Sequence, residues 1–75
     1  MNYLQITTSI QAFRAQLSQN QLTKNDSQRT YIHIRSSITS AEFKHEITDS
    51  QWNECMKLLD LVRIDFVNQF PRVSI

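Results

Sequence analysis

The sequence of 75 residues contains no glycine, although average usage would give about five. Phosphate-binding loops, dinucleotide-binding turns, nucleophile elbows and EF-hand loops all need glycine at fixed positions. Only a residue without Cβ permits their turns and the close approach of backbone to ligand. The absence of glycine therefore excludes these classes of nucleotide-binding, catalytic and calcium site.

The chain also has little cysteine and no long hydrophobic run. Its one cysteine cannot form a disulfide within the chain, and a lone thiol suits a reducing compartment. No stretch approaches the roughly 18 apolar residues of a membrane span, and residues 1–16 lack a basic region followed by an apolar run. We therefore expect a cytoplasmic protein without a membrane partner, folded as a single domain over residues 1–75.

Excess charge is likewise scarce. Eight Lys and Arg stand against seven Asp and Glu, a net charge of +1. The two parts of the chain differ mildly, with residues 1–41 at +3 and residues 42–75 at −2. A dedicated nucleic-acid binder usually has a much larger basic excess, so direct nucleic-acid binding is the less favoured prediction.

The N-terminal half predicts a helix, a loop and a strand. Thr8 and Gln11 form a capping-box pattern, and the apolar residues that follow recur every three or four positions, so the spacing predicts a helix at about 8–21. Residues 23–28 are rich in turn formers and predict a loop. Residues 29–38 alternate with period two and contain β-branched residues, which predicts a half-buried strand. Its inward side would comprise Thr30, Ile32, Ile34 and Ile38.

Residues 39–48 fit two interpretations. Helix propensity favours a short helix, with Thr39 and Glu42 as a capping box and Phe43 and Ile47 as an i, i+4 pair. A second strand, joined to the first by a turn around Ser37–Ser40, would instead give the first strand a partner within the chain. We take the hairpin as the prediction because a lone strand leaves its backbone unsatisfied.

The C-terminal part predicts a long helix that begins at Thr48 or Asp49, with Thr48 and Gln51 as a capping box, and ends before Pro71. Its core-facing stripe would comprise Trp52, Cys55, Met56, Leu59, Val62, Phe66, Val67 and Phe70. A minor alternative places a separate strand after a helix that ends near Asp60, since Val62, Ile64 and Phe66 also alternate.

These elements predict a small α+β domain of order α-β-β-α, with an antiparallel hairpin packed on two helices. The alternative is an α-β-α-α dimer. In that arrangement a strand at 29–35, followed by helices at 40–47 and 49–69, resembles the ribbon–helix–helix family. The resemblance implies a dimeric transcriptional regulator whose intermolecular ribbon reads the DNA major groove with Arg29, Tyr31, His33 and Arg35.

Two surfaces are candidates for binding a partner. On a strand, Arg29, Tyr31, His33 and Arg35 would share one face, and arginine and aromatic side chains are well suited to recognising acidic or aromatic groups. The second surface is apolar. Leu58, Leu61 and Ile64 fall away from the core stripe of the last helix, so they predict either burial against another part of the chain or an interface with a partner, including a homodimer.

No residues form a pattern for catalysis or for a cofactor. The spacing of Cys55 with His33 and His45 is not that of a zinc site, and Cys55 on an apolar stripe is predicted to be a small buried side chain. Glu42 and Glu46 alternate with a lysine on a face that we expect to be solvated. We therefore predict no enzyme, no cofactor and no metal.

The remaining interpretation is a non-enzymatic protein-binding module. In size and composition the chain resembles the small inhibitors that phages and mobile elements use against host defences, such as anti-CRISPR proteins. The resemblance implies steric blocking of a nucleic-acid-handling host complex.

Overall fold

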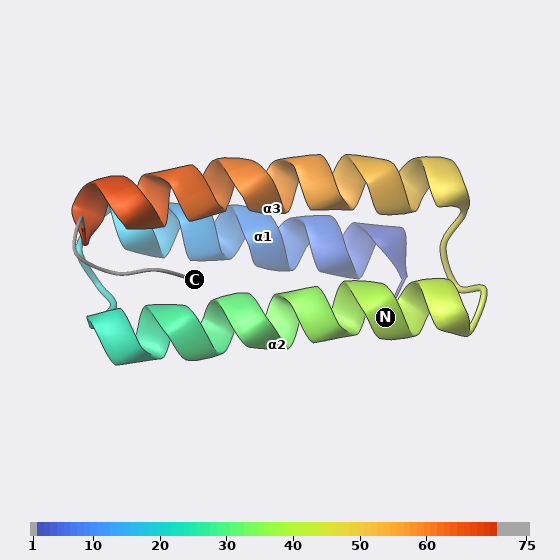
Figure 1. The fold of residues 1–75 in the computed structure, drawn as a ribbon, viewed down its shortest axis with the longest axis horizontal. Coiled ribbons are helices and arrows are strands. Elements are labelled where there is room, and N and C mark those ends of the chain that lie inside the picture. The colour runs from blue at the N-terminus through green and yellow to red at the C-terminus, as the bar shows by residue number, and fades with distance from the viewer. Residues whose placement is uncertain (1, 71–75) are drawn as a thin grey trace.

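The computed structural model describes residues 2–70, which form three α-helices: α1 (Tyr3–Ser18), α2 (Lys24–Phe43) and α3 (Asp49–Gln69). The helices lie side by side, with α1 and α3 running in the same direction and α2 running against both (Figure 1). The bundle measures 35 × 20 × 17 Å. It is an up-down-up three-helix bundle without a strand in residues 2–70.

The predicted α+β fold is therefore wrong. The strand expected at 29–38 lies entirely within α2, and the turn expected around Ser37–Ser40 is an uninterrupted part of the same helix. The second strand expected within residues 39–48 is not formed: residues 39–43 belong to α2, and residues 44–48 form the loop before α3. The intermolecular ribbon of the alternative fold needs a strand at 29–35, so the structure contradicts that arrangement as well.

The reason for the error is that one short segment satisfies two periods. Thr30, Ile32 and Ile34 alternate as in a strand, but the buried positions of α2 follow the three- and four-residue spacing of a helix. Tertiary packing decided between them, because β-branched residues are only weakly unfavourable in a helix. The buried residues of α2 are Ser27, Tyr31, Ile34, Ile38 and Ala41.

The first helix also begins earlier than predicted. Its N-cap is Asn2, whose side chain accepts a hydrogen bond from the backbone N–H of Gln5 at 2.9 Å. The Gln5 side chain accepts one in return from the backbone N–H of Asn2 at 3.0 Å. Thr8, the predicted cap, lies inside the helix. The capping box predicted at Thr48 and Gln51 is confirmed, and α3 continues from it to Gln69 without the break near Asp60.

At the ends of α1 and α2, residues other than glycine occupy the left-handed position where glycine is usual. Asn20 and His45 each follow a C-cap residue with a left-handed backbone, at φ 55° and 59°. After α1, the N–H of Gln21 donates to the carbonyl of Gln16 at 3.0 Å. The corresponding bond after α2 runs from Glu46 to Ala41 at 2.8 Å. These are Schellman motifs, which usually hold glycine at the left-handed position.

The core is a single cluster shared by the three helices. Cys55 is fully buried within it, which confirms the prediction of a small buried side chain. Of the predicted stripe on α3, four residues are buried, Trp52, Met56 and Phe70 are partly buried, and Val67 is 36% exposed. The core residues of α1 and α3 are Ile6, Ile10, Phe13, Leu17, Cys55, Leu59, Val62 and Phe66.

Candidate protein-binding surface

The four residues predicted to share one strand face are separated by the helix. Because successive residues of a helix turn by about 100°, Arg29 and His33 lie on one side of α2, and Tyr31 and Arg35 lie on another. Tyr31 is only 7% exposed and belongs to the core. Arg29, His33 and Arg35 are exposed. The structure thus keeps both arginines at the surface and removes the tyrosine from it, while their role in binding stays a prediction.

The outward side of α2 carries two apolar side chains that the sequence reasoning missed. Phe43 is 84% exposed and Ile32 is 59% exposed. They are eleven positions apart, so they point in nearly the same direction, roughly 20° apart, at a separation of about 16 Å along the helix axis. Arg29 and Arg35 lie roughly 60° to either side of Ile32. We call these four residues the outer α2 stripe: Arg29, Ile32, Arg35 and Phe43.

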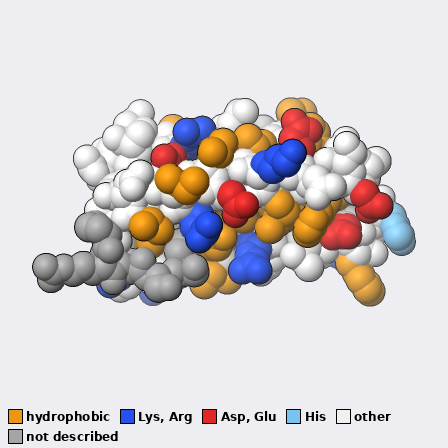
Figure 2. Space-filling view, turned by 45° about the horizontal axis from the view of Figure 1, so that its top comes forward, with side chains coloured by type: hydrophobic (Ala, Val, Ile, Leu, Met, Phe, Trp, Pro, Cys, Tyr) orange, Lys and Arg blue, Asp and Glu red, His pale blue; other side chains and the backbone are white. Residues whose placement is uncertain are grey.

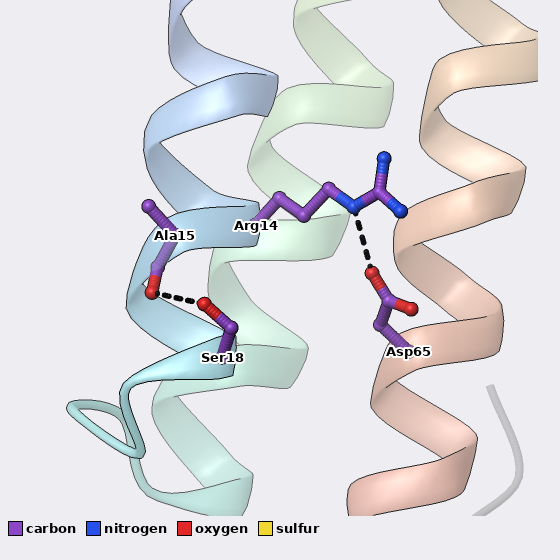
Figure 3. A network of polar contacts seen from close by, with 4 residues as sticks. All are labelled: Arg14, Ala15, Ser18 and Asp65. Atoms are coloured by element: carbon purple, nitrogen blue, oxygen red, sulfur yellow. Dashed lines mark hydrogen bonds and ion pairs between the residues drawn. The ribbon is translucent and has the colours of Figure 1, made fainter.

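The two arginines of this stripe form no ion pair with any residue from 2 to 70, unlike the other two arginines of that range. Arg14 of α1 donates from Nε to the carboxylate of Asp65 in α3 at 2.9 Å (Figure 3). Arg63 lies 3.8 Å from Asp60 on its own helix. The guanidinium groups of the outer α2 stripe are therefore available to acidic groups of another molecule.

Small hydroxyl residues fill the space between Ile32 and Phe43. The side chain of Thr39 donates to the carbonyl of Arg35 at 3.1 Å, so its hydroxyl proton is used within the helix. An open hollow beside the phenyl ring is lined by Arg35, Ser36, Thr39, Ser40 and Phe43. Because the serine and threonine side chains beside Phe43 are short, its phenyl ring can enter a cavity of a partner.

The second predicted surface, on α3, is only partly exposed. Leu58 is half-buried and packs against the core, whereas Leu61 and Ile64 are 45% and 51% exposed. The face turned to the viewer in Figure 2, which includes α3, shows hydrophobic side chains interleaved with both signs of charge. The structure therefore places Leu61 and Ile64 together at the surface, without Leu58 as a full member.

The exposure of Ile32 and Phe43 can be predicted from the sequence if residues 29–43 are interpreted as a helix. In a helix that buries Ile34 and Ile38, the positions of Ile32 and Phe43 fall on the opposite side. In the predicted hairpin, Ile32 would instead lie on the inward side of the first strand. Phe43 would share the inward side of the second strand with Ala41, His45 and Ile47. The error in secondary structure thus concealed the apolar part of the surface.

The pKa shifts of the Cys55 thiol and the Tyr3 phenol do not indicate a reactive side chain. Burial raises the pKa of the Cys55 thiol, which keeps it in the unreactive neutral form. A hydrogen bond with Glu54 raises the pKa of Tyr3. Within the described range, no three His, Cys, Asp or Glu side chains gather closely enough to hold a metal ion.

Three comparisons with known proteins gave no match: no family model, no curated protein and no solved structure is significantly similar to the chain. None of the helices formed by residues 2–70 combines the length and apolar character that crossing a membrane requires.

Proposed function

We propose that the protein is a non-enzymatic binding module that docks on an acidic, apolar surface of another protein through the outer α2 stripe. The observation that carries the proposal is the exposure of Phe43, 84%, on a helix that also presents two unpaired arginines. A phenylalanine in water gains nothing for the monomer, whereas buried aromatic and arginine side chains supply most of the energy of many interfaces.

The stripe has the form of a helix that inserts into a groove. Apolar side chains separated by three helical turns, flanked by charges, are typical of helices that anchor in a partner's hydrophobic groove. Because both flanking charges are positive, the rim of that groove should be acidic. The carboxylates of α2, Asp26 and Glu42, lie roughly 80–120° away from the two apolar side chains of the stripe. Neither carboxylate forms an ion pair with an arginine of the stripe.

The consequence of binding that we propose is steric blocking of a nucleic-acid-handling host complex, the action implied by the resemblance to anti-CRISPR inhibitors. One long side of the bundle measures 35 by 20 Å, which suits the ~800 Å² that each partner contributes to a standard interface. A body of this size can cover a functional patch without any catalytic group.

Affinity capture of the tagged protein from its host cell, after nuclease treatment, tests the proposal. We compare the wild type with Phe43→Ser and with the double variant Arg29→Glu, Arg35→Glu, and then measure affinity for the captured protein by calorimetry. Loss of a central anchor typically costs at least about 2 kcal/mol, or roughly 30-fold in affinity. We expect both variants to lose the partner while their circular dichroism spectra remain helical.

Two control variants make the same kinds of substitution on the other two helices. Leu4→Ser removes another exposed apolar side chain, 71% exposed on α1, and the double variant Lys57→Glu, Arg63→Glu makes the same change of charge on α3. Both controls should bind as the wild type does. Equal losses in the controls, or a capture that disappears with nuclease treatment, would contradict the proposal.

A further inference from the structure

The outward face of α2 has the residue spacing of a coiled-coil contact. Figure 1 shows α2 alone along one long side of the bundle, with α1 and α3 together on the other side. Exposed residues recur along its outward face at alternating intervals of four and three positions, which is the heptad spacing of helices that pack against a second helix. We call this row the α2 seam; it comprises Asn25, Arg29, Ile32, Ser36, Thr39 and Phe43.

The two apolar side chains of the seam lie symmetrically about its centre. Ile32 and Phe43 are equally distant from the midpoint between residues 37 and 38. If a second copy of α2 runs antiparallel about a two-fold axis at this midpoint, Ile32 of each copy lies opposite Phe43 of the other. Ser36 then lies opposite Thr39, and these short side chains let the two helices approach closely. The two-fold axis repeats each contact, so both copies bury both apolar side chains.

Two charged residues beside the seam fit the same register. Arg35 and Glu42 lie on the same side of the seam, each roughly 80° from it. They are seven positions apart, too far for an i, i+3 or i, i+4 pair, and neither forms an ion pair with any of residues 2–70. In the antiparallel arrangement, Arg35 of one copy and Glu42 of the other differ by only about 3 Å in height along the axis. The arrangement therefore allows two salt bridges between groups that are unpaired in the monomer.

Other registers of the same two helices bring like charges together. A shift by one heptad in one direction places Arg35 against Arg35 of the second copy, and a shift in the other direction places Glu42 against Glu42. A parallel pair of helices places Arg29 against Arg29 within the seam. Of these registers, the antiparallel one centred between residues 37 and 38 matches apolar with apolar side chains and cations with carboxylates. This complementarity identifies a second copy of the chain as the occupant.

The surface opposite Ile32 of the second copy is hollowed. In a coiled coil, a side chain of one helix inserts among four residues of the facing helix. For a side chain opposite Phe43, three of these four residues are Thr39, Glu42 and Phe43 itself. The same three residues, together with His45, line an open hollow at this end of α2. Ile32 of the second copy can therefore insert beside the phenyl ring.

We propose that a second copy of this chain covers the outer α2 stripe, in an antiparallel two-fold dimer whose α2 helices meet along the α2 seam. One helix face from each copy is smaller than a standard interface, so the dimer is weak and reversible. The consequence for regulation rests on the proposed function: the dimer covers the stripe, so the protein partner binds the monomer and competes with the second copy.

Sedimentation equilibrium of the full chain tests the dimer. Loading concentrations from about 10 µM to about 1 mM cover the range of weak complexes. Arg35→Glu and Glu42→Arg each turn both salt bridges of the dimer into contacts between like charges, so each variant alone should self-associate at least about tenfold more weakly than the wild type. An equimolar mixture of the two variants should recover the wild-type dimer, because both contacts then join opposite charges again.

Control substitutions separate this register from a general effect of charge. Lys57→Glu and Asp60→Arg make the corresponding changes on α3 and should each dimerise as the wild type does, whereas Phe43→Ser should remain monomeric. The inference is overturned by a wild type that is monomeric at about 1 mM, by variants of Arg35 and Glu42 that dimerise as the wild type does, or by a mixture of these two that stays monomeric.

Partner capture distinguishes the failure of this inference from the failure of the proposed function. Glu42 lies outside the outer α2 stripe, so Glu42→Arg should lose self-association and still capture the partner at least as well as the wild type; loss of capture would contradict the competition. The proposed function falls if Phe43→Ser and the double arginine variant still capture the partner, whatever the oligomeric state. The dimer falls if the wild type sediments as a monomer, whatever protein is captured.

Discussion

The outward faces of α2 and α3 both carry exposed apolar side chains, but they differ in how they use charge. On α3, Leu61 and Ile64 are 45% and 51% exposed, and the neighbouring Asp60 and Asp65 are paired with arginines within the chain. On α2, Ile32 and Phe43 are more exposed, at 59% and 84%, and the arginines beside them are unpaired. Apolar exposure alone does not distinguish the two helices, whereas the use of charge does.

The charged groups beside the exposed apolar residues of α3 are paired within the monomer, whereas the arginines beside those of α2 are not. Scattered apolar residues on a protein surface are normal, and the ion pairs around those of α3 are satisfied in the folded chain. The charges of α2 form no ion pair with any of residues 2–70. Substitutions made in matched pairs on the two helices can break or sharpen this comparison.

The largest effect should come from one substitution, phenylalanine to alanine, made on each helix. Phe66→Ala on α3 removes a fully buried ring that packs against Phe70 at 5.2 Å between centroids, so it should lower the free energy of unfolding by about 3–5 kcal/mol. Phe43→Ala on α2 should change it by less than about 0.5 kcal/mol. Urea denaturation followed by circular dichroism measures both values.

A small domain has little stability to lose. If Phe66→Ala does not fold, Phe66→Leu gives a smaller loss in the same direction. A loss from Phe43→Ala as large as that from either Phe66 variant would show that Phe43 serves the fold, and the contrast between the two helices would disappear.

The second effect concerns the starts of the two helices, which both have threonine as N-cap. Thr48 of α3 forms a reciprocal capping box with Gln51, whereas the side chain of Thr23 accepts a single hydrogen bond, from the N–H of Asp26 at 3.1 Å. Replacing an N-cap threonine by alanine costs about 0.5–2 kcal/mol. We expect the double variant Thr48→Ala, Gln51→Ala to lie higher in this range than Thr23→Ala, because it removes both bonds of the box. The single variant Thr48→Ala would keep the bond from the backbone N–H of residue 48 to Gln51.

Thermal unfolding of both variants, with Thr8→Ala as a control inside α1, gives the order. The opposite order, with Thr23→Ala the more damaging, would mean that the start of α2 stabilises the fold more than its hydrogen bonds indicate.

The start and register of α3 could be predicted from sequence because every local signal agrees. Its capping box precedes a stripe of apolar residues whose spacing is that of a helix, and no other period fits the whole segment. In α2 the alternation of Thr30, Ile32 and Ile34 imitates a strand, and only the burial of Ser27 and Tyr31 by the other helices resolves it. That burial depends on contacts with the other helices, so it cannot be predicted from the local sequence pattern.

The candidate surface follows the same division. Arg29 and Arg35 could be found as surface residues because arginine rarely lies in a core under either interpretation. Ile32 and Phe43 could not, since their direction depends on whether the segment turns by about 100° or 180° per residue. The apolar half of a docking surface is therefore the half most sensitive to an error in secondary structure.

A third, smaller effect is expected at the end of α2, just beyond Phe43. His45 has φ 59°, a conformation that is costly for residues with a Cβ and free of strain for glycine. The left-handed backbone costs a residue with a Cβ about 1–2 kcal/mol, and the extra freedom of glycine in the unfolded chain offsets about 0.4–1 kcal/mol of that. His45→Gly should therefore stabilise the protein by about 0.5–1 kcal/mol. Asn20→Gly, at the matching position after α1, should gain less because asparagine tolerates this conformation better.

Urea denaturation of the two glycine variants tests this expectation, and partner capture with His45→Gly shows whether the end of α2 can change without loss of binding. Destabilisation by His45→Gly would show that the imidazole makes a contribution that exceeds the backbone strain.

The smallest effect tests the charge half of the comparison. A double-mutant cycle of Arg14→Ala and Asp65→Ala should give a coupling of about 0.2–1 kcal/mol, because both side chains of this pair are partly exposed, 52% and 38%. The coupling should shrink as salt is raised from low to high concentration. Arg29→Ala and Arg35→Ala, which break no ion pair, should leave the free energy of unfolding unchanged at both salt concentrations. A salt-dependent decrease in the free energy of unfolding of either α2 variant would show that its guanidinium stabilises the folded monomer electrostatically. The arginines of α2 would then not be free to bind a partner.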